Sequence, residues 1–323
     1  MVIASTRSHE SRSIAALLGL AVGDAYGRPL EFVRGDRVRT LPVSIERGEF
    51  RWTDDTHMAM YLARAILDVS GGARPFDDDA FGHAVGARFI EWSHDPLTPS
   101  TAPGNTCLAG VAAYERGRTW RSSGVATSDG CGAVMRIAPL AMAFDGDTLT
   151  RAAEISSLVT HAHPNAVESA IAASHLLRWV LAGEALDAAL VSRAIDQLHG
   201  SWNRGGTVAK SLETALAHTQ RAGVRWLDED TIWPGDGGWR SGSALGLAIT
   251  AALAWGADAS DAIDRGARIF GDSDSVACLV GMYLGAAGGL DALPADMVAV
   301  VPERGELEHL ARACSALAAA IKP

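Results

Sequence analysis

Apolar residues recur at intervals of three and four in almost every segment of this chain, a spacing that matches the helical period of about 3.6 residues. Alternating apolar and polar positions never run long enough to build a β-sheet. Of the 323 residues, 48% are apolar but only 6% are aromatic, so alanine, leucine, valine and glycine must fill the core. We therefore predict an all-α fold in which residues 1–323 form one compact multi-helix domain.

Glycines and prolines divide the predicted helices. The first helix is expected to end at Gly23, and the pair Gly71-Gly72 is expected to end the second. The predicted helices cover residues 11–22, 54–69, 77–92, 107–116, 149–160, 166–181, 186–198, 208–221, 243–255 and 272–289, with a C-terminal helix within 304–322.

Composition argues against several classes of partner. The formal net charge is −10, which argues against a nucleic acid or an anionic membrane surface as partner. No run reaches the ~18–20 apolar residues that a membrane span needs. The four cysteines are widely spaced and form no CxxC pair, which favours reduced thiols. We expect a cytoplasmic protein; its oligomeric state stays open, with a monomer favoured.

Two helix starts combine carboxylates with hydroxyls. In the first, Thr53 has the position of an N-cap, and Asp54 and Asp55 fall in the first turn. Alone, this pattern is ordinary, because acidic residues stabilise the positive end of a helix. The pattern returns downstream at residues 271–275, again before an apolar helix. If the two starts meet, their carboxylates would repel one another, and a hard divalent cation would remove that repulsion.

Other stretches could contact a ligand, but each also has an ordinary explanation. Glu31 lies between apolar neighbours in a loop, as a partly desolvated carboxylate or as a surface glutamate. The stretch Gly104-Asn105-Thr106 opens a helix whose free N–H groups could bind a phosphate, or is a plain loop-to-helix junction. The small residues around Asp129, Gly130 and Gly132 could admit a ligand to the backbone or serve close helix packing.

Two aromatic features complete the candidates. His161 and His163 have no third ligand at zinc spacing, which favours a turn with one capping or ligand-facing histidine. Trp239 belongs to a loop rich in glycine and tryptophan, residues 232–242, which could close over a base as a lid or cap a helix.

Together these motifs resemble those of the ADP-ribosylglycohydrolase family, which includes dinitrogenase-reductase-activating glycohydrolase and the ADP-ribosyl-acceptor hydrolases. The resemblance extends over about residues 11–290 and keeps the family's motif order. The matching segments are residues 23–27 with Glu31, then 52–56, 128–136, 160–164 and 271–275.

The resemblance implies an all-α hydrolase with a binuclear Mg²⁺ centre, sometimes Mn²⁺, at the bottom of a cleft. Asp274 would bridge the ions, and Glu31, Asp55 and Asp274 would be the catalytic residues. The metal ligands by motif position would be Thr53, Asp54, Asp55, Asp272, Asp274 and Ser275. ADP-ribose would contact Gly104, Asn105, Thr106, Asp129, Gly130, Gly132, His161 and His163, and Trp239 is our added substrate-binding candidate.

This chain departs from the family pattern in three places. Asp129 stands where the family commonly has asparagine, and this extra acid could alter selectivity for the leaving group or repel a phosphate. Ser275 stands where threonine is common, which keeps the ligand oxygen. Residues 201–242 match no family motif.

We predict a metal-dependent hydrolase that cleaves the N- or O-glycosidic bond between ADP-ribose and an acceptor. Arginine is our first choice of acceptor, with serine, a nucleic-acid end, guanidine and a free metabolite left open. The alternative is a non-catalytic ADP-ribose-binding or crystallin-like member of the same fold. A third hypothesis assigns residues 272–274 to the DxD motif of a glycosyltransferase, whose usual α/β sheet this sequence lacks.

Overall fold

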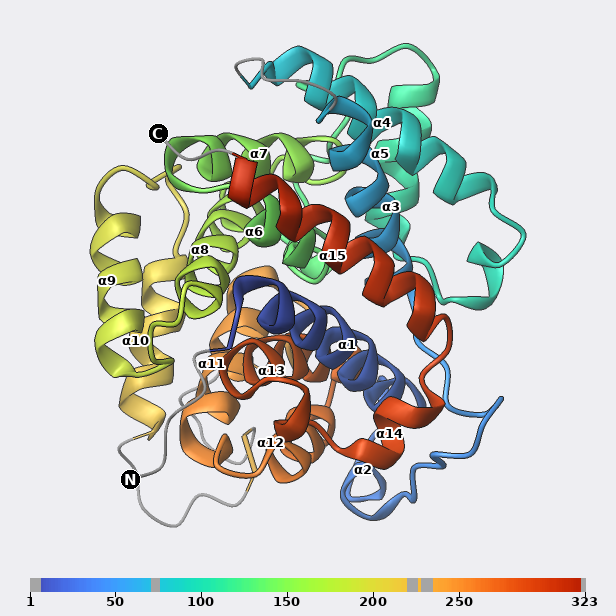
Figure 1. Ribbon diagram of the computed structural model, residues 1–323, viewed down its shortest axis with the longest axis vertical. Coiled ribbons are helices and arrows are strands. Elements are labelled where there is room, and N and C mark those ends of the chain that lie inside the picture. Colours follow the sequence, from blue (N-terminus) through green and yellow to red (C-terminus); the bar gives the residue numbers. More distant parts are fainter. Residues whose placement is uncertain (1–6, 71–75, 220–225, 228–234, 321–323) are drawn as a thin grey trace.

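Every regular element that the computed structural model describes is helical (Figure 1). The structure describes residues 7–70, 76–219, 226–227 and 235–320. Across these ranges there are fifteen α-helices and four short 3₁₀ helices. β-Pairing is limited there to two isolated bridges, Val125 with His161 and Gly130 with Arg240. The prediction of an all-α fold in one compact domain is confirmed.

Most of the described connections between helices are short, but residues 41–53 and 116–130 are longer and contain no helix. None of the described helices combines the length and the apolar character needed to span a membrane. The 3₁₀ helices are η1 (Arg28–Leu30), η2 (Thr98–Ser100), η3 (Cys131–Ala133) and η4 (Leu290–Ala292). The α-helices are α1 (His9–Gly27), α2 (Arg37–Thr40), α3 (Asp54–Val69), α4 (Asp78–His94), α5 (Asn105–Glu115), α6 (Ala138–Ala143), α7 (Gly146–Leu158), α8 (Pro164–Leu181), α9 (Ala188–His199), α10 (Val208–Thr219), α11 (Ser241–Trp255), α12 (Ala259–Ala267), α13 (Ser273–Gly288), α14 (Ala295–Val300) and α15 (Arg304–Ala320).

Helices α1 and α13 pack antiparallel with their backbones in direct contact. A Cβ atom on Gly23 would lie 1.9 Å from the carbonyl oxygen of Ala277, and one on Gly27 would lie 2.5 Å from Asp274 Cα. No side chain fits at such distances, so the glycines allow the C-terminal end of α1 to lie against the start of α13. Gly19 meets Gly281 and Gly285 meets Ala15 in the same way.

The other helices enclose this pair. Helix α15 crosses over α1, α3 and α6 and covers them on the face seen in Figure 1. Helices α4, α5 and α7 pack together beside α3, while α9 and α10 pack against α8 and α11. Helices α11 and α12 pack against α13. The α1–α13 pair therefore lies in the interior, where an early and a late segment of the sequence meet.

The predicted helices are present, with ends displaced by a few residues and one clear error. The first helix does not end at Gly23, because α1 continues through Gly27 and uses these glycines for its contact with α13. The short helices α2, α6, α12 and α14 were not predicted, because four to nine residues carry too little periodicity. The Gly71-Gly72 break lies outside the described residues, as do residues 220–221 and 321–322 of two predicted helices.

Two Gly→Ala variants test the close packing. We expect Gly23→Ala to destabilise the protein by about 1–3 kcal/mol or more, because the new methyl group must push α1 away from α13. The measurement is the free energy of unfolding from denaturant titration. The matched control is Gly305→Ala in α15, where an added Cβ meets no atom within 4 Å. Alanine there should leave stability unchanged or raise it by up to ~1 kcal/mol. Equal effects at the two positions would contradict the packing argument.

Candidate functional site

The carboxylate of Asp24, near the C-terminal end of α1, caps the start of α3. It accepts hydrogen bonds from the backbone N–H groups of Thr53 at 2.8 Å and Thr56 at 3.0 Å, and from Thr56 Oγ1 at 2.6 Å. Asp24 is fully buried. This cap fixes the start of α3 against α1, just as the glycine contact fixes the start of α13. Both acidic helix starts are thereby brought to one place.

A hydrogen bond joins the two acidic starts directly. Ser275 Oγ on α13 donates to Asp55 Oδ1 on α3 at 3.3 Å. Thr53 is the N-cap of α3 and accepts from the N–H of Asp55 at 3.4 Å, and Asp274 Oδ1 accepts from the N–H of Ser275 at 3.0 Å. Asp55 Oδ2 is buried and has no hydrogen-bond partner in the described part of the chain. Side-chain oxygens from the start of α3 and from the start of α13 thus lie together in one buried region.

Asp54 and Asp272 each contact a further segment of the chain. The N–H of Gly104 donates to Asp54 Oδ2 at 3.1 Å. The thiol of Cys131 donates to Asp272 Oδ2 at 2.9 Å, and its sulfur lies 3.4 Å from Ser275 Oγ. The loop before α5 and the 3₁₀ helix η3 therefore border the acidic cluster.

Burial raises the pKa of every carboxyl group in this cluster, and repulsion between neighbouring carboxylates adds to the effect. Burial and then the charge of Asp274 raise the pKa of Asp24 to about 7. The same two causes raise the pKa of Glu31 to about 8. Burial also raises the pKa values of Asp54, Asp55, Asp272 and Asp274.

The chemistry of the cluster fits a hard divalent cation. Carboxylate and hydroxyl oxygens are the ligands that Mg²⁺ and Mn²⁺ prefer, and Asp55 Oδ2 is a buried oxygen without a partner. Among the described residues, however, no three His, Cys, Asp or Glu side chains already form a ligand set. A cation would therefore have to draw these side chains inward. The metal-binding roles of the six residues stay predictions.

Glu31 lies at the edge of the cluster in a strained segment. The next residue, Phe32, has φ +52°, a left-handed conformation that bulky residues rarely adopt. The N–H of Phe32 donates to the carbonyl of Gly271 at 2.8 Å, which holds this segment beside the start of α13. Glu31 is consequently half-buried and close enough to Asp272 and Asp274 for their charges to raise its pKa.

Asp129 does not present a free carboxylate. Its Oδ2 accepts from Asn165 Nδ2 at 3.2 Å and from Arg240 Nη1 at 3.2 Å. A cavity of about 550 Å³ adjoins this pair and is lined by Asn165, Arg240, Asp236 and small or hydroxyl residues. Asp129 is thus paired with an arginine from the loop before α11.

The two histidines of the 161–163 pair have different surroundings. His163 is the N-cap of α8, and its Nδ1 accepts from the N–H of Asn165 at 3.1 Å. His161 is buried next to Gly130 and Gly132, and burial followed by the charge of Arg136 lowers its pKa to about 3. The expected capping histidine is therefore His163, whereas His161 faces the small-residue segment.

The remaining substrate-binding candidates border the same region. Asn105 is exposed at the start of α5, and Thr106 Oγ1 lies 2.9 Å from Ser128 Oγ beside the small-residue segment. Trp239 keeps 44% of its surface exposed, and its ring lies 3.8 Å from where a Cβ on Gly130 would stand. Trp239 therefore flanks Gly130. Part of the predicted lid loop, residues 232–234, lies outside the described residues.

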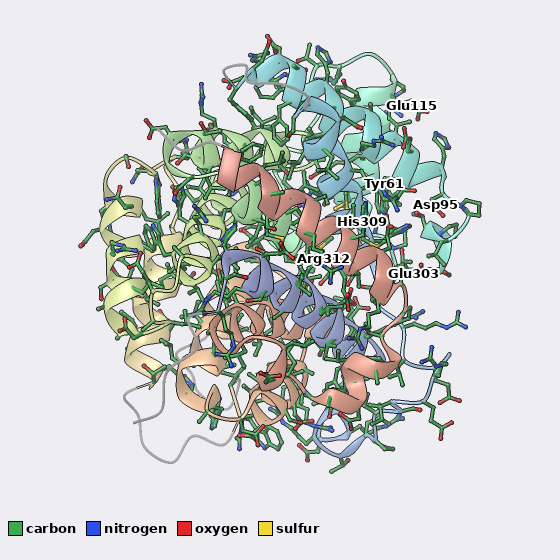
Figure 2. The ribbon with its side chains drawn as sticks, viewed as in Figure 1. Tyr61, Asp95, Glu115, Glu303, His309 and Arg312 are labelled. Carbon is green, nitrogen blue, oxygen red and sulfur yellow. The ribbon has the colours of Figure 1, made fainter. Side chains whose placement is uncertain are left out.

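One histidine of the acidic stretch belongs to a different network. His57 Nε2 lies 3.6 Å from Asp95 Oδ2, and Tyr61 Oη donates to the same oxygen at 2.6 Å. Figure 2 labels Tyr61 and Asp95 on this side of α3. These contacts hold the segment after α4 against α3, so His57 has a structural partner of its own.

Several residues that the structure places at the site were not among the predicted site residues. Asp24 belongs to a recognised motif, but its capping role depends on a contact across the fold. Cys131 and Arg136 also lie in a matched segment, residues 128–136, but were given no role, whereas Arg240 lies in the span 201–242 that matches no motif. For Arg240, the only hint in the sequence is that Asp129 needs a counter-charge.

The chain is similar to known proteins in both sequence and fold. The sequence model of the family described as ADP-ribosylglycohydrolase matches residues 5–322. The ADP-ribosylarginine hydrolase Tri1 of Serratia proteamaculans is 25% identical over 92% of this chain and 76% of its own length. The ADP-ribosyl-[dinitrogen reductase] glycohydrolase of Rhodospirillum rubrum is 26% identical over 56% of this chain and 62% of its own. A solved structure, titled ADP-ribosylglycohydrolase-related protein complex, superposes with a TM-score of 0.75 at 26% identity, covering 96% and 99% of the two chains.

The raised pKa of Glu31 predicts how the stability of the protein depends on pH when a chelator is present. A carboxyl group whose folded pKa exceeds its unfolded value contributes stability at acid pH that is lost as pH rises through the folded pKa. For Glu31 that loss should run from about pH 4.5 to about pH 8. The melting temperature of Glu31→Gln should therefore exceed that of the wild type by an amount that grows as pH rises from 5 to 8. The measurement is thermal unfolding in EDTA.

The control is Glu49→Gln, which changes an exposed glutamate in the loop before α3. The melting difference between this variant and wild type should stay constant over the same pH range. If the difference in melting temperature between Glu31→Gln and the wild type stayed constant or became smaller as pH rises, ionisation of Glu31 would not destabilise the folded chain.

Proposed function

The chain belongs to the ADP-ribosylglycohydrolase family, and we propose that it hydrolyses the N- or O-glycosidic bond between ADP-ribose and an acceptor with the help of divalent cations. The observation that most supports this is the meeting of two acidic helix starts, joined by the hydrogen bond from Ser275 to Asp55. Both starts lie in motifs that resemble those of the family.

The proposed cation ligands are Thr53, Asp54 and Asp55 on one side and Asp272, Asp274 and Ser275 on the other. When bound there, a pair of Mg²⁺ or Mn²⁺ ions would neutralise the carboxylates, grip the vicinal hydroxyls of the distal ribose and activate a water. Asp55 Oδ2 supports this assignment, because it is a buried oxygen that has no hydrogen-bond partner among the described residues.

Glu31 is the proposed acid–base group, or alternatively a ligand that gates the site. Cleavage of the glycosidic bond passes through an oxocarbenium-like state, and the leaving group needs a proton. Burial and then the charge of Asp274 raise the pKa of Glu31 to about 8, which is the direction that a group donating a proton requires. To act on the leaving atom, it must come within ~2.6–3.2 Å, directly or through one water.

We propose ADP-ribosylarginine as the first substrate to test, because the Serratia relative is named for that activity. The ADP-ribosyl part would lie along the candidates Gly104–Thr106, Gly130–Gly132 and His161, which border the acidic cluster. The Asp129–Arg240 pair sits at the edge of this path, where it would meet the acceptor or the diphosphate. A non-catalytic ADP-ribose-binding protein is the alternative, distinguished by binding without turnover on any acceptor.

The variant Asp274→Ala tests the proposed cation centre. We expect hydrolysis of ADP-ribosylarginine to fall to background, and affinity for Mn²⁺ to fall by more than about 100-fold, because the proposed bridging ligand is lost. Hydrolysis is measured with Mg²⁺, Mn²⁺ or chelator, on arginine, serine and small-molecule conjugates. Mn²⁺ binding is measured separately by calorimetry.

The control for this test is Asp291→Asn, an exposed acid on η4. It should retain wild-type hydrolysis and cation affinity. If Asp274→Ala hydrolysed its substrate at the wild-type rate, the assignment of the cation centre would be wrong. Tight ADP-ribose binding without turnover in the wild-type protein would instead support the non-catalytic alternative.

A further inference from the structure

Arg136 is a fully buried arginine that lies between η3 and α6. Its guanidinium group stacks over the ring of Phe89 at 4.5 Å. Its Nη2 donates to Ser156 O and to Thr160 Oγ1, both at 2.8 Å. Its Nη1 faces sulfur atoms, with Met58 Sδ at 3.5 Å. Its hydrogen bonds and ion pairs within the described residues include no carboxylate, so its charge acts on this interior without a direct counter-ion.

The hydroxyl of Thr160 lies between Arg136 and His161. It accepts a hydrogen bond from Arg136, because a guanidinium can only donate. Its other polar neighbour is Nδ1 of His161, at 2.9 Å. Thr160 has one hydrogen to give, is fully buried, and has no other acceptor among the described residues. The arrangement that satisfies every group is therefore a donation from Thr160 to a bare Nδ1.

A bare Nδ1 places the proton of a neutral imidazole on Nε2. His161 is neutral, because burial and the nearby charge of Arg136 both lower its pKa. The protonated nitrogen faces the small-residue segment: a Cβ on Gly132 would lie 3.3 Å from Nε2, and one on Gly130 would lie 3.6 Å away. Within the described residues Nε2 has no hydrogen-bond partner, so its N–H is available to a ligand.

We infer that Arg136 and Thr160 are positioning residues that hold His161 in its neutral Nε2–H tautomer, so that this N–H donates to an oxygen of the bound ADP-ribosyl group. The tautomer follows from the contacts within the chain. The identity of the ligand rests on the proposed function. The opposite tautomer would turn a bare nitrogen toward the ligand, which would repel a phosphate oxygen and could bond only to a hydroxyl that donates to it.

The first test is ¹⁵N NMR of the histidine rings in the full-length wild-type protein. The signal of His161 is identified by its loss in His161→Gln. We expect an Nε2 of the protonated type and an Nδ1 of the bare type. A wild-type spectrum with the proton on Nδ1 overturns the inference, and this result needs no variant of Arg136 or Thr160.

The second test compares Thr160→Val with Thr160→Ser. Valine keeps the shape but removes the hydroxyl, so the ring should lose its single tautomer and ADP-ribose affinity should fall about 10- to 100-fold, the range expected for a lost hydrogen bond to a charged or polar group. Serine restores the hydroxyl and should restore both the spectrum and the affinity. Thermal unfolding of each variant shows whether an affinity loss reflects misfolding, and equal losses in both variants at wild-type stability would contradict the positioning role.

Two ligands distinguish the possible acceptor oxygens, and the outcomes separate this inference from the proposed function. If the oxygen belongs to the diphosphate, Thr160→Val should weaken ADP and ADP-ribose alike, whereas a distal-ribose oxygen would spare ADP. An Nε2–H tautomer with no ADP-ribose binding would contradict the proposed function and the ligand contact, while the positioning of the ring would stand. Normal hydrolysis with an Nδ1–H tautomer would contradict the inference alone.

Discussion

The backbone contact between α1 and α13 is the constraint on which the candidate site depends. The two helices come from opposite ends of the sequence, and glycines on both let them approach without intervening side chains. Glycine inside a helix costs roughly 0.5–1 kcal/mol relative to alanine. In return, the end of α1 lies against the start of α13, close enough for Asp274 to raise the pKa of Asp24. If the two helices lay further apart, the carboxylates would be separated. Their mutual repulsion would then be lost, and the candidate site would be lost with it.

Hydrogen bonding divides the buried carboxylates into two kinds. Asp24 accepts three hydrogen bonds from the start of α3, which makes it part of the framework. Asp55 has one oxygen in contact with Ser275 and one with no partner among the described residues. An unpaired buried oxygen costs stability unless something outside the chain meets it. Asp24 thus holds the helices in place, while one oxygen of Asp55 has no hydrogen-bond partner in the described part of the chain.

Local signals predicted the helices well, and long-range contacts explain what was missed. The cap at Thr53 and the acids after it defined the start of α3, because capping involves only neighbouring residues. The same local logic misread Gly23 as a helix end, because its real purpose is a contact with Ala277. That the two acidic starts meet was a conditional expectation, since no local pattern reports the approach of α1 to α13. The pairing of Asp129 with Arg240 spans 111 positions and leaves no spacing for a sequence to reveal.

The acidic cluster also constrains where an anionic ligand can lie. A diphosphate beside several carboxylates, in a chain of net charge −10, requires positive potential from nearby groups. Arg240 supplies part of it by neutralising Asp129, and the buried Arg136 supplies more without contacting solvent. Because burial, and after it the charge of Arg136, lowers the pKa of His161 to about 3, the segment from Gly130 to Gly132 would offer a ligand backbone groups and a neutral N–H. Under the proposed function, the carboxylates would lie at the end of the site that binds a cation and a sugar diol, and the diphosphate would lie at the end with the arginines and the neutral N–H.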